Sequence, residues 1–290
     1  MKLNPYCIRC QLDKQEERIR GFEDKKKKMD YMRYVLKTLY EAGDESCAPA
    51  ISHTFRKYYS RYWNVPEKDF TDIKREYNSL MLNLEDRIYK EIKGSDDPLK
   101  AALLYARTGN YIDYAALPDV NPDTLLQLLF SDLKGSIDNL EYSIFRSELE
   151  SAGTLLYITD NCGEIVLDKL VIRLLNEKFP QLRVTVLVRG GQTVNDADMT
   201  DAEMCGLTQL VPVISSGNQV PGTYFPLLSD ESRAALETAD MIISKGQGNF
   251  ETLHDCGLNI YYLFLCKCQY FQDMFHAEKL QGMFVNERRL

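Results

Sequence analysis

The chain has 290 residues, of which 44% are hydrophobic, and a formal net charge of −8. Such a chain can bury a core in one large domain or two modest ones, and its acidity argues against the basic face with which nucleic-acid binding proteins neutralise phosphates. It has no apolar run of about 18 residues and no apolar segment of signal-peptide type near its start, so we expect a cytoplasmic protein without nucleic-acid or membrane partners.

The first motif along the chain is a C-x-x-C pair, Cys7 and Cys10. One pair without a second at zinc-ribbon spacing is a weak metal signal, although Cys266 and Cys268 offer two more thiolates for a four-ligand site. Without an export signal, the eight cysteines are expected as thiols or metal ligands instead of disulfides. Cys7 and Cys10 are therefore candidates for a second metal site.

Residues 1–150 are predicted to form a helical domain. Apolar residues recur at helical spacing with charged residues between them, as at Leu80, Leu84 and Ile88, and no segment here has a convincing strand pattern. The segment ARTGNYIDYAAL, residues 106–117, interrupts the helical pattern with a glycine. That glycine either caps a helix or belongs to a site.

From residue 151 the pattern becomes that of an α/β domain. Five short apolar runs alternate with helical segments: TLLYIT, RVTVLV, QLVPVI, DMIIS and NIYYLFL. Strands separated by helices of crossover length form parallel sheets. We therefore predict a Rossmann-like, doubly wound and mainly parallel sheet in residues 151–290.

Polar residues follow each predicted strand. In open parallel sheets, ligands bind beyond the carboxyl ends of the strands. The residues at this edge are Asp160 and Asn161 after the first run, Asn195 and Asp196 past the second, Ser215, Ser216 and Gly217 after the third, Lys245 and Gly246 after the fourth, and Lys267 after the fifth. Together they define a candidate site.

Asp160, Asn161 and Asp196 offer two carboxylates and an amide oxygen. This hard oxygen set suits Mg²⁺ or Mn²⁺, with positions left for water and substrate. The alternative is that Asp160 and Asn161 cap the helix that starts near Glu164, a role that both residue types fill well. The spacing alone leaves both interpretations open.

The segment SKGQGN places Lys245 between an apolar strand and a helix expected to begin near Phe250. The ammonium group and the N–H groups of flanking glycines such as Gly246 suit a phosphate, and an ordinary turn is the alternative. GQGN is not a dinucleotide-binding motif, because the third glycine is missing and the segment follows the fourth strand instead of the first.

The order of these motifs is that of a known family. An N-terminal C-x-x-C, GNYID, DNCGE, ND after the next strand, SKGQGN and a late KC span nearly the whole chain. The chain thereby resembles the damage-control phosphatase family, long catalogued as a domain of unknown function, and specifically its subfamily with N-terminal cysteines. The resemblance implies a helical part packed on a Rossmann-like domain, and hydrolysis of small phosphate monoesters such as sugar phosphates or damaged phosphometabolites.

The resemblance also implies roles for individual residues. Asp160, Asn161 and Asp196 would form the catalytic centre and bind the divalent metal, which is Mg²⁺, Mn²⁺, Co²⁺ or Ni²⁺. The small phosphorylated metabolite would be bound by residues of both halves, namely Asn110, Asp113, Glu164, Lys245, Gly246, Asn249 and Lys267. Other subfamilies carry R-T-x-K near the C-terminus, where this chain has FLCK, so only Lys267 matches. The metal and the lysines would neutralise the phosphoryl oxygens while water attacks in line.

Two other functions compete with this one. A methyltransferase with the same layers would need a glycine-rich first loop, and DNCGE supplies one glycine. A metal-sensing or redox module built on Cys7, Cys10, Cys266 and Cys268 would leave the acidic and basic residues at the strand ends without a purpose. We adopt the phosphatase interpretation because it uses both of those groups.

Overall fold

A computed structural model describes residues 1–43, 46–117, 120–130 and 136–290, which form two compact units, Met1–Lys68 and Asp69–Leu290. The sequence pattern predicts a division at residue 150, where the secondary structure changes from helices to alternating strands and helices. The compact units instead divide after Lys68. The helices that follow Lys68 therefore belong to the same unit as the sheet.

The first unit contains three helices, α1 (Pro5–Ile19), α2 (Lys25–Tyr40) and α3 (Ala48–Trp63), which pack against one another. Side chains of Asn4 and Asp24 cap α1 and α2 by accepting hydrogen bonds from backbone N–H groups of their first turns. The core of this unit consists of aliphatic and aromatic residues, namely Ile19, Tyr31, Val35, Leu39, Ile51, Phe55 and Trp63.

The second unit begins with four helices, α4 (Thr71–Lys93), α5 (Pro98–Gly109), α6 (Pro122–Phe130) and α7 (Asn139–Ser151). An alternation of strands and helices follows: β1 (Thr154–Ile158), α8 (Glu164–Lys178), β2 (Arg183–Val188), α9 (Met199–Met204), β3 (Val213–Ser215), α10 (Asp230–Thr238), β4 (Met241–Lys245), α11 (Gln247–Leu253), β5 (Ile260–Leu265), α12 (Gln269–Phe275) and β6 (Gly282–Asn286). Short 3₁₀ helices lie at Leu207–Gln209, Phe225–Leu227 and Glu287–Arg289.

The six strands form one sheet in the order β3-β2-β1-β4-β5-β6. All neighbouring pairs are parallel except β5 and β6, so the predicted Rossmann-like, mainly parallel sheet is confirmed. The prediction missed β6, which is antiparallel and follows the last predicted strand. The chain order reverses between β1 and β4, and such a switch point opens a crevice at the carboxyl ends of the strands.

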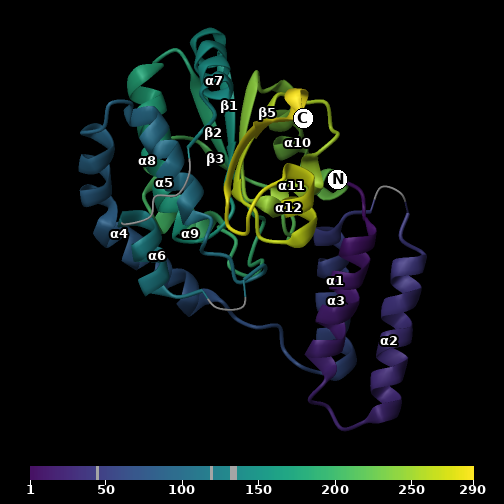
Figure 1. The fold of residues 1–290 in the computed structure, drawn as a ribbon. Helices are drawn as coiled ribbons and strands as arrows, with labels where there is room; N and C mark the ends of the chain where they lie inside the picture. The colour runs from purple at the N-terminus through teal and green to yellow at the C-terminus, as the bar shows by residue number, and fades with distance from the viewer. Residues whose placement is uncertain (44–45, 118–119, 131–135) are drawn as a thin grey trace. The chain divides into compact units, whose positions relative to one another are not determined.

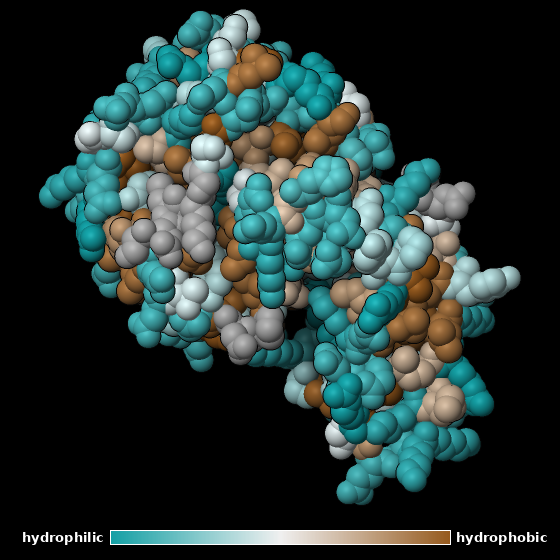
Figure 2. Space-filling view, in the orientation of Figure 1, coloured by the Kyte–Doolittle hydropathy of each residue, from teal (hydrophilic) through white to brown (hydrophobic). Residues whose placement is uncertain are grey.

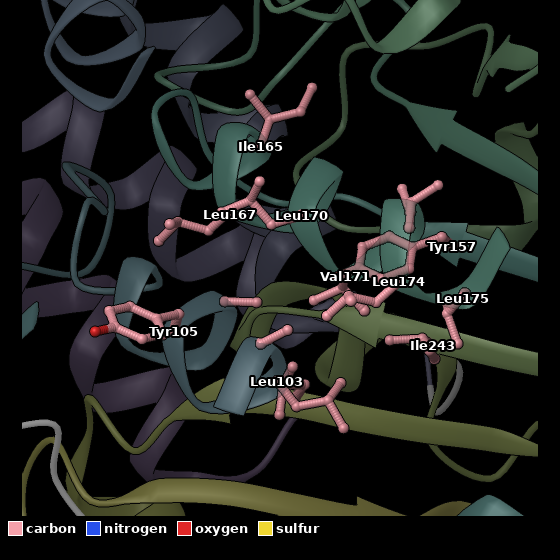
Figure 3. Close-up of a cluster of buried hydrophobic side chains, with 14 of the residues drawn as sticks. Leu103, Tyr105, Tyr157, Ile165, Leu167, Leu170, Val171, Leu174, Leu175 and Ile243 are labelled. Carbon is pink, nitrogen blue, oxygen red and sulfur yellow. The ribbon is translucent and has the colours of Figure 1, made fainter. Parts of the chain in front are cut away.

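Helices cover both faces of the sheet (Figure 1). Helices α4, α5 and α8 lie on one side and α10, α11 and α12 on the other. Figure 3 shows the core on the first side, where α8 presents a continuous apolar face that includes Leu170 and Leu174 to Tyr157 of β1 and Ile243 of β4. The completely buried residues of α8 hold its N-terminus at the switch point.

Figure 2 shows a mostly hydrophilic face with hydrophobic residues in small patches. Within the described ranges, none of the helices is both long and apolar enough to cross a bilayer. All eight cysteines are free thiols, as the sequence analysis expects.

Candidate active site

Asp160 and Asp196 lie side by side because the backbone that follows β1 pairs with the loop that follows β2. Asn161 and Asp196 form an isolated antiparallel bridge, and the N–H of Ala197 donates to the carbonyl oxygen of Asp160 at 2.7 Å. This pairing brings an acidic residue from each loop to the switch point. Both carboxylates are buried, with 6% and 5% of the residues exposed.

The side chains of Asp160 and Asn161 do not cap α8. The N-cap residue of this helix is Gly163, and no side-chain hydrogen bond caps it. Gly163 has φ 68°, and a Cβ atom there would lie 2.9 Å from Cδ1 of Ile112. The tight turn from β1 into α8 therefore needs a glycine, and the side chains of Asp160 and Asn161 belong to the sheet edge instead.

The carboxylate of Asp160 is held from two sides. Its Oδ2 accepts hydrogen bonds from Nδ2 of Asn110 at 2.9 Å and from Nδ2 of Asn161 at 2.8 Å. Gly246, with φ 80°, lies so close that a Cβ atom at that position would overlap the carboxylate of Asp160. Gly246 therefore shapes the space that Asp160 occupies, and Oδ1 is the less constrained oxygen.

Arg189 is a site residue that the sequence analysis missed. The guanidinium is 1% exposed and donates from Nε to Oδ2 of Asp196 at 2.7 Å and from Nη2 to Oδ1 of Asn249 at 3.0 Å. Its Nη1 is buried and has no hydrogen-bond partner among the described residues. The available signal was an arginine immediately after the apolar run RVTVLV, at the same strand edge as Asp160.

Asn249 has a supporting position beside Arg189. Its Nδ2 donates to the carbonyl oxygens of Thr159 at 3.1 Å and of Lys245 at 2.5 Å. The side chain thus ties the ends of β1 and β4 together and positions Arg189, so its polar atoms are already used.

Lys245 is completely buried, and three protein groups accept hydrogen bonds from its ammonium. It donates to Oε1 of Glu164 at 2.6 Å, to Oδ1 of Asp168 at 2.7 Å and to the carbonyl oxygen of Ala106 at 2.9 Å. Three acceptors use all three N–H bonds of an ammonium. The structure therefore places Lys245 beneath Glu164, an arrangement that differs from the direct phosphate contact expected from the sequence.

Lys267 has a more open hydrogen-bonding position than Lys245. Its ammonium donates to Oδ2 of Asp113 at 2.7 Å, while Oδ1 of Asp113 accepts from the N–H groups of Ala115 and Ala116. Burial acts to raise the pKa of Asp113, but Lys267 and these N–H groups outweigh it and lower that pKa. Two N–H bonds of Lys267 thus have no partner within the described ranges.

The remaining carboxylates carry unfavourable charge. Burial first, and then the carboxylates of Asp196 and Glu164, raise the pKa of Asp160 well above its usual range. Burial also raises the pKa of Asp196, against the opposing effect of Arg189. Burial likewise raises the pKa of Asp168 to about 6, although Lys245 opposes this shift. The cluster as a whole therefore has too few positive charges to balance its carboxylates.

The charge count of the cluster makes this deficit explicit. Fully ionised, its five carboxylates and three cations leave a formal charge of −2; they are Asp113, Asp160, Glu164, Asp168, Asp196, Arg189, Lys245 and Lys267. One divalent cation would neutralise this charge. The oxygen donors of Asp160, Asn161 and Asp196 fit a hard ion of that charge.

The cysteines predicted as a second metal site lie in the first unit, on α1. Cys7 is buried and Cys10 is exposed. Cys266 and Cys268 lie in the second unit, at the end of β5 and just before α12. Metal binding by the C-x-x-C pair stays a prediction.

A separate group of possible metal ligands lies at the opposite edge of the sheet. Within the described residues, His254, Asp255 and Glu287 are the group of three His, Cys, Asp or Glu residues whose ligand atoms all lie within 4.8 Å of one another. Glu287 follows β6, which runs antiparallel to β5, so the group lies near the start of β5. Nδ1 of His254 lies 3.1 Å from Oε2 of Glu287, and the N–H of Asp255 donates to Oε1 of Glu287 at 2.7 Å, so hydrogen bonding accounts for the arrangement.

The fold and this cluster define a Rossmann-like α/β protein with a buried acidic site at its topological switch point. The sequence model of the damage-control phosphatase ARMT1-like domain matches residues 3–281. The chain belongs to this damage-control phosphatase family.

Relatives cover almost the whole chain. A damage-control phosphatase of Archaeoglobus fulgidus is 28% identical over 93% of each chain, and one of Pyrococcus horikoshii is 30% identical over 92% of each chain. The crystal structure of a DUF89 family protein from Pyrococcus horikoshii superposes with a TM-score of 0.80, at 25% identity, and covers 99% of both chains. The family resemblance inferred from the motifs is thus confirmed.

Proposed function

We propose that this protein is a divalent-metal-dependent phosphatase that hydrolyses small phosphate monoesters. The observation that carries the proposal is the excess of two negative charges in the buried cluster, at the switch point of a chain that belongs to a phosphatase family. Buried carboxylates repel one another unless a cation is present. A divalent ion would remove that repulsion and supply the charge needed by a phosphoryl group.

Asp160, Asn161 and Asp196 would hold this ion. Hard oxygen donors favour Mg²⁺ or Mn²⁺, and Co²⁺ or Ni²⁺ are the other ions implied by the family resemblance. When bound, the ion would neutralise charge on the phosphoryl oxygens and orient the group for attack by water. The bridge between Asn161 and Asp196 would hold two of the ligands at a fixed separation.

Lys267 and Arg189 would bind the phosphoryl oxygens directly. The ammonium of Lys267 has two N–H bonds without an acceptor among the described residues. Nη1 of Arg189 has no acceptor among those residues either. An unsatisfied buried donor is unfavourable and favours an anionic ligand that satisfies it. Lys245 would act indirectly, since its ammonium is saturated.

The helical part of the second unit would contribute to the substrate pocket. Asn110, at the end of α5, donates to Asp160, and Asp113 holds Lys267, so residues before 150 reach the cluster. The substrate bound in this pocket would be a small phosphorylated metabolite. The free thiols fit a reducing compartment, and a cytoplasmic location is part of the proposal.

A phosphate-release screen tests this function. Purified protein would be incubated with sugar phosphates and p-nitrophenyl phosphate, each with Mg²⁺, Mn²⁺, Co²⁺, Ni²⁺ or excess chelator. We expect phosphate from at least one monoester only when a divalent ion is supplied. Full activity in chelator, or no activity with any ion and monoester, would contradict the proposal.

A further inference from the structure

The orientation of the Asn161 carboxamide is fixed by its neighbours. Its Nδ2 donates to Oε2 of Glu164 and to Oδ2 of Asp160, both at 2.8 Å. A carboxylate that pairs with an ammonium, as Glu164 does with Lys245, accepts hydrogen bonds, so the nitrogen must be on this side. The oxygen is thus on the other side, where it accepts from Nδ2 of Asn195 at 3.1 Å.

Orientation matters because an amide can bind a cation only through its oxygen. If the carboxamide of Asn161 rotated by half a turn, its oxygen would face the carboxylates of Glu164 and Asp160. That contact would be repulsive, and the NH₂ group would then face Nδ2 of Asn195, with no amide oxygen on that side to bind a cation. The two carboxylates therefore select the rotamer in which Asn161 can be a ligand.

Hydrogen bonds from neighbouring groups occupy both carboxylate oxygens of Glu164. Its two oxygens accept from Lys245 at 2.6 Å, from Nδ2 of Asn110 at 3.1 Å each, and from the backbone N–H and Nδ2 of Asn161 at 3.2 and 2.8 Å. A carboxylate has about four lone-pair sites. No site is left for a metal ion, and a phosphate would be repelled.

The position of Glu164 is itself determined by buried groups on regular elements. Lys245 of β4 is anchored by Asp168 of α8 at 2.7 Å, and Asp168 accepts from the hydroxyl of Tyr157 of β1 at 2.7 Å. All four side chains, Tyr157, Asp168, Lys245 and Glu164, are completely buried. The chain of contacts fixes Glu164 with the rigidity of the sheet and α8.

We infer that Glu164 is a positioning residue that orients Asn161 as a metal ligand, and not a residue that binds phosphate. This inference rests on the proposed metal-dependent function. Groups behind the ligands commonly fix ligand orientation, and their loss lowers metal affinity about 10- to 100-fold. Lys245 then helps to position Glu164, which accounts for its location beneath that residue.

The test is a titration of the wild-type protein and of Glu164→Gln with Mn²⁺, measured by isothermal titration calorimetry. Glutamine keeps the shape of Glu164 but can donate to the oxygen of Asn161, so both rotamers become available. We expect about 10- to 100-fold weaker Mn²⁺ binding with the fold retained. Glu85→Gln is the matched control, because Glu85 also pairs with a lysine, Lys169, at 2.6 Å. This control variant should bind Mn²⁺ like the wild type.

Two further variants test whether the loss comes from the orientation of Asn161 or from a general effect of charge, and Glu164→Asp, which keeps the charge, separates these two causes. The double variant Glu164→Gln, Asn161→Asp keeps the total charge and presents an oxygen in either rotamer, so we expect its Mn²⁺ affinity to recover most of the loss. Glu164→Asp keeps the charge but withdraws the carboxylate from Asn161, and we expect weakened binding. Glu164→Asp also keeps the inference testable if the neutral single variant does not fold.

The outcomes distinguish this inference from the proposed function. A wild type that binds Mn²⁺ and hydrolyses p-nitrophenyl phosphate, with Glu164→Gln and Glu164→Asp binding Mn²⁺ equally well, overturns the inference alone. Loss in Glu164→Gln without recovery in the double variant overturns it too, because the amide orientation would not be the cause. A wild type that binds no divalent ion contradicts the proposed function, and the inference with it.

Discussion

Gly246→Ala perturbs the site without changing its charge. Gly246 has φ 80° and ψ 155°, a backbone region open in practice only to glycine. A methyl group there would also overlap the carboxylate of Asp160. The substitution must therefore strain the backbone between β4 and α11 and displace Asp160.

The magnitude follows from these two effects. The backbone conformation costs a non-glycine residue on the order of 1–3 kcal/mol. Displacing Asp160 removes the hydrogen bonds from Asn110 and Asn161, at about 1 kcal/mol each. We expect the free energy of unfolding to fall by about 3–5 kcal/mol and Mn²⁺ binding to be lost.

Gly248→Ala is the matched control, two residues further on in α11. A Cβ atom there would meet Gly222 at 3.8 Å, an ordinary contact, and Gly248 is within a helix. Alanine in a helix is favoured over glycine by about 0.5–1 kcal/mol. Urea unfolding curves and Mn²⁺ titrations of both variants measure the difference. Equal stability of the two variants, with Mn²⁺ binding intact in Gly246→Ala, would refute the reasoning.

Four further predictions concern the same cluster and the N-terminal cysteines. Asp160→Asn should abolish Mn²⁺ binding yet leave the metal-free protein at least as stable as the wild type in urea, because burial and neighbouring carboxylates raise the pKa of Asp160; a clear loss of stability would contradict this. Asp160 and Asp168 have raised pKa values, so the folded metal-free protein binds more protons than the unfolded chain. Its free energy of unfolding should therefore fall as pH rises from about 4 to about 6, and saturating Mn²⁺ should suppress that fall. A rise in this free energy over the same range without metal would show that other groups dominate. Lys267→Met should raise KM for a phosphate monoester about 10- to 100-fold, the loss of one charged hydrogen bond, with Mn²⁺ affinity nearly unchanged, and an unchanged KM would exclude a phosphate contact. Replacing Cys7 and Cys10 by serine should lower bound zinc or iron, or thermal stability, and leave turnover with Mn²⁺ intact, whereas loss of turnover in folded protein would place the cysteines at the active site.

The sheet and the site edge were predictable because their signals are local. Five apolar runs separated by helical segments specify a parallel sheet, and the residues after each run fall at one edge by geometry. This geometry predicts that Asp160, Asn161 and Asp196 lie together, and the structure has them side by side, while their role as metal ligands stays a proposal. The antiparallel strand β6 was missed because GMFVN is short and is not followed by the helix and strand expected of another crossover.

Side-chain roles were less predictable, because they depend on three-dimensional partners. Lys245 ends one buried strand and Lys267 follows another. The first ammonium is saturated by Glu164, Asp168 and Ala106, while the second has one partner among the described residues. Arg189 was missed because nothing in the sequence says that its guanidinium turns toward Asp196. The packing of the helices after Lys68 on the sheet was equally hidden, since helical periodicity identifies an apolar face but not what covers it.

The most direct test of the central claim is one titration that follows Mn²⁺ binding and p-nitrophenyl phosphate hydrolysis in the same samples of wild-type, Asp160→Asn and Asp240→Asn protein. Asp240 accepts hydrogen bonds from Gly153 and Thr154 at the other end of β1, and its substitution is the matched control. We predict that turnover rises in step with the binding of Mn²⁺ in the wild type and in Asp240→Asn, and that Asp160→Asn shows neither. Turnover that is complete before Mn²⁺ binds, or that persists in Asp160→Asn, would contradict a metal-dependent phosphatase site at the β1 and β4 switch point.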